Sequence, residues 1–174
     1  MEFAARHSES DFKRTFFGLR PGDEVEVFGP RGDFFLESDL PGVLVAAGIG
    51  ITPLKSMLEY ATDVALPTRL MLVYGSRSPE EIAFADDLEM LVRANPQIAV
   101  VHTVTTPSWG WSGHVGRIDG ALLREAASGQ PDALYYLAGP SRMVEEAYRA
   151  TTSLGVPESR IRYEVFHGYG ESRD

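Results

Sequence analysis

Apolar stretches alternate with amphipathic segments along most of the chain after residue 40. The short apolar stretches predict buried strands over 43–47, 69–74, 98–104, 133–138 and 160–166. Segments with apolar residues at helical spacing lie between them, near 53–62, 79–94, 119–127 and 140–154. Alternation of this kind favours right-handed βαβ units and a parallel sheet covered on both faces. The pattern therefore predicts an α/β fold with a doubly wound, five-stranded parallel sheet.

The first 40 residues have a different character. Ser10 and Asp11 are typical of the start of a short helix. The alternation over 24–28 predicts a half-buried strand, and a second short strand is expected over 34–36. Turns rich in glycine and proline precede both strands. We therefore expect antiparallel β structure over residues 1–40 and the parallel sheet over residues 41–174.

Composition narrows the functional classes. The 174 residues include 44% hydrophobic and 24% charged positions, which is the profile of a globular chain able to bury a core. The formal net charge of −9 disfavours a nucleic acid or an anionic membrane surface as partner. The absence of cysteine excludes disulfides, thiolate metal sites and a cysteine nucleophile. The N-terminus lacks a signal-peptide pattern and no apolar run reaches about 20 residues, so we expect a cytoplasmic protein with no membrane span.

A glycine-rich turn follows the first predicted strand. Residues 48–53 read Gly-Ile-Gly-Ile-Thr-Pro and stand between that strand and a predicted helix. Glycines at such a place let the backbone approach a diphosphate, and the helix N-terminus presents free amides. A tight turn without any ligand is the alternative. Pro53 stands where the usual dinucleotide fingerprint carries its third glycine, which disfavours a plain NAD dehydrogenase.

Four further stretches carry a family resemblance. AAGIGITPLKSML, LVYGSRSPEEIAFADDLE, DALYYLAGPSRMVEEA and RIRYEVFHGYG together resemble the pyridine-nucleotide domain of the ferredoxin-NADP reductase family. The earlier stretch SESDFKRTFFGLRPGDEVEVFGPRGDF resembles the last part of that family's flavin-binding barrel. We do not find the family's Arg-x-Tyr-Ser/Thr flavin motif in the chain. The resemblance thus implies a partial FAD-binding barrel over 1–40 and an NAD(P)-binding domain over 41–174.

The resemblance assigns two loops to the nucleotide. The first holds the pyrophosphate through Gly48, Ile49, Gly50, Thr52 and Pro53, and Thr52 would lie near the nicotinamide end. The second contains Ser76 and Arg77, which offer a donor and a cation to a ribose 2′-phosphate and so favour NADP over NAD. A solvent-facing Arg77, or one paired with Glu80 or Glu81, is the alternative interpretation.

Further site residues follow from the same resemblance. A third loop joins the nucleotide site through Ala138, Gly139, Pro140, Ser141 and Met143, and Ala138 replaces the cysteine usual in the family. Glu164 would orient the nicotinamide or relay a proton, as the catalytic residue, and Phe166 or Tyr169 would cover the flavin ring; a packed edge strand is the alternative. Ser10 begins a helix that would meet the flavin pyrophosphate.

Histidines and tryptophans have weaker patterns. His7, His102, His114 and His167 lack metal-ligand spacing, so no metal site is expected. Trp109 and Trp111 fall in a long predicted loop over 105–116. This loop could flank a nucleotide, although we expect the two indoles to pack over the sheet edge.

Two functional hypotheses result. The first is an oxidoreductase, or its nucleotide half, that passes hydride from NADPH or NADH to a flavin and electrons to a ferredoxin or flavodoxin-like protein. FAD would bind only if the missing half of the barrel were supplied. The second is a non-catalytic NAD(P)-binding module, or a subunit whose flavin site another chain completes. Under either hypothesis the strands over 24–36 expose edges and should pair with another copy, giving a homodimer, or be mobile.

Overall fold

The structure, a computed structural model, describes residues 3–5, 9–29, 32–37 and 39–166. It divides into two units, Met1–Asp33 and Phe34–Asp174. The second unit contains the sheet, and the first contains one short helix. The assignment of residues 1–40 and 41–174 to two different domains stays a prediction.

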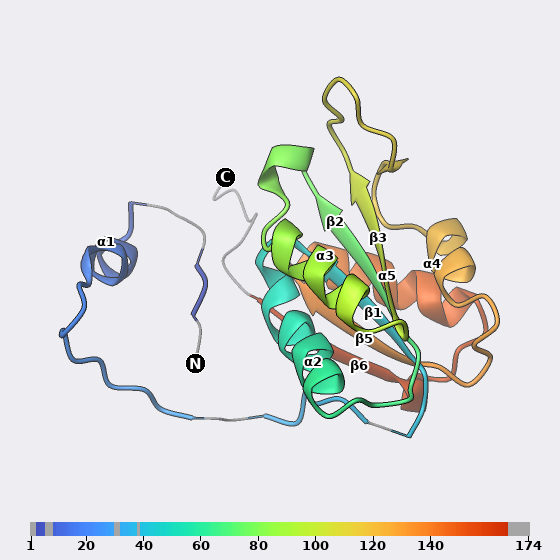
Figure 1. Ribbon diagram of the computed structural model, residues 1–174. Helices are drawn as coiled ribbons and strands as arrows, with labels where there is room; N and C mark the ends of the chain where they lie inside the picture. The colour runs from blue at the N-terminus through green and yellow to red at the C-terminus, as the bar shows by residue number, and fades with distance from the viewer. Residues whose placement is uncertain (1–2, 6–8, 30–31, 38, 167–174) are drawn as a thin grey trace. The chain divides into compact units, whose positions relative to one another are not determined.

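The second unit alternates strands and helices as predicted (Figure 1). Its strands are β1 (Gly42–Ala47), β2 (Leu70–Ser76), β3 (Ile98–Val104), β4 (His114–Val115), β5 (Leu134–Gly139) and β6 (Ile161–Val165). Its α-helices are α2 (Ile51–Asp63), α3 (Ala85–Ala94), α4 (Gly120–Ala126) and α5 (Ser141–Ser153), and its 3₁₀ turns are η1 (Gly48–Gly50), η2 (Pro79–Glu81) and η3 (Glu158–Arg160).

All six strands run parallel in the order β4-β3-β2-β1-β5-β6. The α/β doubly wound fold is confirmed, whereas the expectation of five strands is wrong. The additional strand, β4, pairs His114 and Val115 with the end of β3. Both residues are exposed, so no apolar run marks them as a strand.

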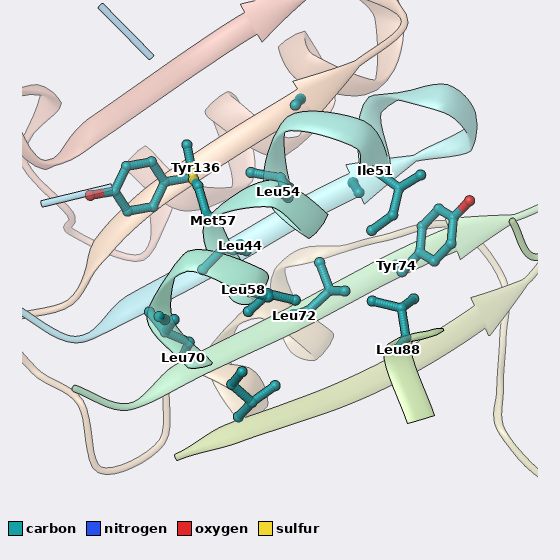
Figure 2. Packing of buried hydrophobic residues seen from close by; sticks show 14 of the residues in the cluster. Leu44, Ile51, Leu54, Met57, Leu58, Leu70, Leu72, Tyr74, Leu88 and Tyr136 are labelled. Carbon is teal, nitrogen blue, oxygen red and sulfur yellow. The ribbon is translucent and has the colours of Figure 1, made fainter. Parts of the chain in front are cut away.

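A hydrophobic core lies on each face of the sheet. Leu44 of β1 faces the core beneath α2 and α3, while its neighbours Val43 and Val45 face the core beneath α4 and α5. This division follows from the alternation of side chains along a strand. Figure 2 shows the first core, where Leu54 and Leu58 of α2 meet the strands. Two covered faces explain why β1 and β5 read as continuous apolar runs.

In the first unit, α1 (Asp11–Gly18) begins where the sequence predicts. The Ser10 side chain accepts a hydrogen bond from the Lys13 amide, as expected of an N-cap. The strands predicted over 24–28 and 34–36 are not formed, so that prediction is wrong. A strand needs a hydrogen-bonded neighbour, and Val25, Val27 and Phe28 are exposed without one in the described residues. The barrel assignment itself stays a prediction.

Among the helices of the described residues, none is long and apolar enough to cross a bilayer.

Candidate functional site

The carboxyl ends of the parallel strands gather the predicted site residues along one edge of the sheet. In the register of the sheet, Ala46 pairs with both Tyr74 and Ala138, and Ala138 pairs in turn with Glu164. The loops after β1, β2 and β5 and the end of β6 therefore lie side by side (Figure 1). Ser10 belongs to the first unit, so its assignment to a flavin stays a prediction.

Two of these loops pack directly against each other. A Cβ atom added to Gly50 would lie 2.1 Å from the Ala138 carbonyl oxygen. A Cβ atom added to Gly139, whose φ is +152°, would lie 2.6 Å from Cε of Met143 and 3.1 Å from the Ala47 carbonyl oxygen. The backbones can approach this closely only because both positions are glycine. The contact lies between β1 and β5, where the strand order reverses and open α/β sheets bind their ligands.

Gly48 has a different environment. Its φ is +53°, and an added Cβ atom would meet no other atom within 4 Å. The Tyr74 hydroxyl, on a fully buried side chain, donates a hydrogen bond of 3.0 Å to the Gly48 carbonyl oxygen. Tyr74 thus holds the loop from below and leaves the space above it open. Sequence reasoning missed this role, although a tyrosine in a buried strand requires a partner for its hydroxyl.

The loop after β1 forms the single 3₁₀ turn η1, which leads directly into α2. The Ile51 amide donates to the Gly48 and Ile49 carbonyl oxygens at its end. Thr52 directs its hydroxyl inward and donates 3.1 Å to the Ile49 carbonyl oxygen. Pro53 stands in the first turn of α2, where its missing N–H costs no helical bond. The positive end of α2 makes this loop suited to an anion.

The end of β2 carries a second polar group. Ser76 Oγ is buried with no hydrogen-bond partner, and the exposed Arg77 makes no ion pair with any residue that the structure describes. Arg77 is therefore solvent-facing, as one alternative interpretation had it, and forms no ion pair with Glu80 or Glu81. Hydrogen bonds from Ser78, from its own amide and from Ser108 instead lower the pKa of Glu80. Arg77 thus remains available to an anionic ligand.

β6 and the start of α5 complete the edge. Glu164 is exposed on the edge strand, beside the buried Ala138 in the register of the sheet. The Phe166 amide donates 2.9 Å to the Gly139 carbonyl oxygen, and its ring packs partly against the first core. Pro140 caps α5, and Ser141 and Met143 stand in its first turn. The packed interpretation of Phe166 is therefore realised in part, and its role toward a flavin is untested.

The two tryptophans differ in burial. The Trp111 indole N–H donates 3.0 Å to the His114 carbonyl oxygen, and its ring lies so close to Gly113 that an added Cβ would be 2.5 Å away. Trp109, in contrast, is fully exposed. The expectation that both indoles pack is therefore wrong for Trp109.

His102 lies on β3 next to Tyr74, with ring centroids 5.8 Å apart. Its Nδ1 is buried without a partner, and burial lowers the pKa of its imidazole. His7, His167 and Tyr169 fall outside the described residues. Within the described residues, no three or more histidine, aspartate or glutamate side chains are grouped so as to hold a metal ion.

Comparison with known proteins agrees with this geometry. Residues 44–149 match the family described as the oxidoreductase NAD-binding domain, and the chain belongs to that family. Its resemblance to ferredoxin-NADP reductase-like proteins is confirmed. Ferredoxin-NADP reductase B of Sorangium cellulosum is 34% identical over 156 residues, which are 85% of this chain and 64% of that protein.

Other known proteins are also similar to this chain over part of their length. The flavohemoprotein of Pseudomonas putida is 35% identical over 152 residues, which are 85% of this chain and 38% of that protein. The chain thus spans less than two thirds of these relatives. The cytochrome b5 reductase domain of Ulva prolifera nitrate reductase matches with a TM-score of 0.79 and 24% identity, over 89% of this chain and 66% of that one. That likeness shows a shared fold.

Proposed function

We propose that this chain binds NADPH or NADH at the carboxyl edge of its sheet and serves as the nucleotide-binding half of an oxidoreductase. The contact of Gly50 with the Ala138–Gly139 backbone is the observation that carries the proposal. This contact joins the loop after β1 to the loop after β5, between the two strands where the strand order reverses. The space around Gly48 in the first of these loops is open. Membership of the oxidoreductase NAD-binding domain family supports it.

The diphosphate would bind to the loop after β1. The backbone of Gly48, Ile49 and Gly50 and the dipole of α2 would face its charge, with Thr52 and Pro53 shaping the side nearer the nicotinamide. On the β5 side, Ala138 and Gly139, followed by Pro140, Ser141 and Met143, would line the other wall. Glu164 would lie by the nicotinamide and orient it or exchange a proton there.

The adenosine end would lie over the end of β2. The orphaned Ser76 hydroxyl and the unpaired Arg77 guanidinium suit a 2′-phosphate, which favours NADPH. Arg77 is exposed, so we expect it to contribute roughly tenfold in affinity, about 1.4 kcal/mol.

The flavin requires groups from elsewhere. In the described residues, Ser10 is the group assigned to the flavin pyrophosphate, and its hydroxyl already caps α1. That hydroxyl accepts the cap hydrogen bond and keeps its O–H as a donor, but one hydroxyl is not enough to hold a flavin, and the chain has no Arg-x-Tyr-Ser/Thr motif. We propose that FAD, which would take hydride from the nicotinamide and pass electrons to a ferredoxin or flavodoxin-like protein, is held by residues outside the described ones, with Phe166 near its ring. Another protein chain or a second copy of this one could supply these residues.

Titration of the full chain with NADPH and NADH, followed by calorimetry and by the visible absorption of any flavin, tests the proposal. We expect both nucleotides to bind, with NADPH tighter. Arg77→Ala should weaken NADPH about tenfold and leave NADH unchanged, and Arg93→Ala, on the outer side of α3, should change neither. Failure of the wild-type chain to bind either nucleotide would contradict the proposal.

The non-catalytic module is the second candidate function. The unpaired segment with exposed Val25, Val27 and Phe28 favours it, because a flavin barrel needs those strands to be formed. Nucleotide binding without flavin absorbance in the purified chain would support this candidate. Bound flavin that nucleotide reduces would support the oxidoreductase.

A further inference from the structure

Trp109 lies in the segment that connects β3 to β4, which projects beyond the carboxyl ends of the strands (Figure 1). Its side chain is fully exposed, while Trp111 two residues later is hydrogen-bonded and packed. Packing of this segment therefore does not depend on the Trp109 indole. A single exposed apolar residue is common, so its location must decide whether it has a function.

The segment is anchored to the end of β2. The Thr105 amide donates 3.2 Å to the Ser76 carbonyl oxygen, and the Thr106 amide donates 2.7 Å to the Arg77 carbonyl oxygen. Trp109 follows Thr106 by three residues, so their Cα atoms are at most about 11 Å apart. The indole is consequently tethered close to the residues that we assign to the ribose phosphate.

A second tie comes from η2. The Ser108 side chain faces the Glu80 carboxylate, and hydrogen bonding from Ser78, from the Glu80 amide and from Ser108 lowers the pKa of Glu80. Glu80 is therefore ionised at neutral pH, and a phosphate beside Ser108 would be repelled. An uncharged base beside Ser108 would not be repelled by Glu80, and the Arg77 guanidinium can bind the phosphate. The negative charge of Glu80 and the positive charge of Arg77 thus favour the phosphate of a bound nucleotide near Arg77 and its uncharged base near Ser108.

We propose that Trp109 is the platform on which the adenine base of the bound nucleotide stacks. The inference rests on the proposed function, which it extends by naming a residue for the base. An indole face and a purine face attract each other in offset stacking, and such contacts contribute on the order of 1–3 kcal/mol. Full exposure of Trp109 in the free protein leaves its ring available for that contact.

Binding of 5′-AMP, NADPH and nicotinamide mononucleotide to the full chain tests the proposal by calorimetry and by tryptophan emission. We expect Trp109→Ala to weaken 5′-AMP and NADPH about tenfold and to leave nicotinamide mononucleotide unchanged. Trp109→Phe should stay within about twofold of wild type in affinity but lose most of the emission change. Tyr60→Ala, which removes an exposed aromatic ring on α2, serves as the matched control and should change nothing.

The outcomes separate the two proposals. If wild type binds NADPH, and Trp109→Ala binds 5′-AMP with the same affinity as wild type, the proposal that adenine stacks on Trp109 is wrong and the proposed function stands. Equal weakening of nicotinamide mononucleotide by Trp109→Ala would also overturn it, because the effect would then not concern the base. If wild type binds neither NADPH nor NADH nor 5′-AMP, both proposals fail.

Discussion

Gly48 and Gly50 stand two positions apart in one loop, but each needs to be glycine for a different reason. At Gly48 the reason is backbone conformation, because φ is +53° and the surrounding space is open. At Gly50 the reason is space, because any Cβ would enter the backbone of Ala138. We therefore expect Gly48→Ala to lower the free energy of unfolding by about 1 kcal/mol, and Gly50→Ala by about 3 kcal/mol.

Urea unfolding of the full chain measures both values. Gly18→Ala is the control, since an added Cβ there meets nothing within 4 Å and the glycine ends α1 at ordinary φ. Equal losses at Gly48 and Gly50 would show that the two loops separate easily, and the contact on which the nucleotide site is built would then be weak.

His102 gives the protein a pH dependence of known sign. Burial lowers the pKa of its imidazole in the folded state below the 6.5 of an ordinary histidine, so the unfolded chain binds the proton more tightly. Stability from the neutral form is complete above pH 6.5, falls as the pH drops toward the folded-state pKa, and levels off below it. Within that window the slope for one proton is at most about 1.4 kcal/mol per pH unit.

Urea unfolding between pH 7.5 and 5 tests this expectation. His102→Gln should reduce the loss of stability on acidification, whereas His114→Gln, which removes an exposed histidine at β4, is the control for the loss of an imidazole. An unchanged pH profile in His102→Gln would mean that the buried imidazole does not contribute to acid sensitivity.

At the residue level, the sequence identifies the glycine loop but not the different reasons why Gly48 and Gly50 must be glycine. The motif places Gly48 and Gly50 between a strand and a helix, and the structure does the same. The contact of Gly50 with Ala138 depends on residues 88 positions apart, which no local pattern reveals. The hydrogen bond from Tyr74 to Gly48 is likewise long-range.

Among the elements, α2 and α3 are joined by a buried cation. The Lys55 side chain is 7% exposed; its Nζ lies 2.6 Å from a carboxylate oxygen of Glu59, 3.1 Å from one of Asp87 and 4.9 Å from the centre of the Phe84 ring. Removing both carboxylates would take two negative charges away from a buried ammonium. We expect Glu59→Ala with Asp87→Ala to lower the free energy of unfolding by about 3 kcal/mol.

Adding Lys55→Met to that double variant should recover most of the loss, since methionine keeps the contact with Phe84 and brings no charge. The exposed pair Arg93–Glu89 on α3 supplies the control, and Glu89→Ala should change stability by at most about 0.5 kcal/mol. Thermal or urea unfolding of these variants measures the differences. A triple variant as unstable as the double would show that packing, rather than the loss of the two carboxylates beside a buried charge, causes the loss.

The elements that the sequence predicts well are those with strong apolar periodicity. β3 has its predicted bounds, and β1, β2, β5 and β6 differ by at most two residues at an end. The helix expected near 79–94 is instead the turn η2 followed by α3 from Ala85, because Phe84 adopts φ +58° between them. A left-handed phenylalanine has no local signature; its ring here lies near Lys55 and packs partly against the first core.

For the whole molecule, residues 34–37 belong with the sheet although the sequence groups them with the first 40 residues. The ring of Phe34 meets that of Tyr136 at 6.0 Å, and the Glu37 amide donates 2.9 Å to the Tyr136 hydroxyl oxygen. The Glu37 carboxylate also lies 2.7 Å from the Arg162 guanidinium. These contacts depend on residues about 100 and 125 positions away, so composition alone could not assign them.

Two truncated chains make that organisation testable. The chain 34–174 should unfold with a free energy within about 1 kcal/mol of the full chain, because α1 buries no residue and Phe12 and Phe28 remain exposed. The chain 41–174 should lose about 2–3 kcal/mol more, since it also loses the ring contact and the hydrogen bond to Tyr136 and the ion pair with Arg162. Urea unfolding measures both. A large loss already in 34–174 would mean that the first unit stabilises the sheet, and equal stability of the two truncated chains would mean that residues 34–37 do not.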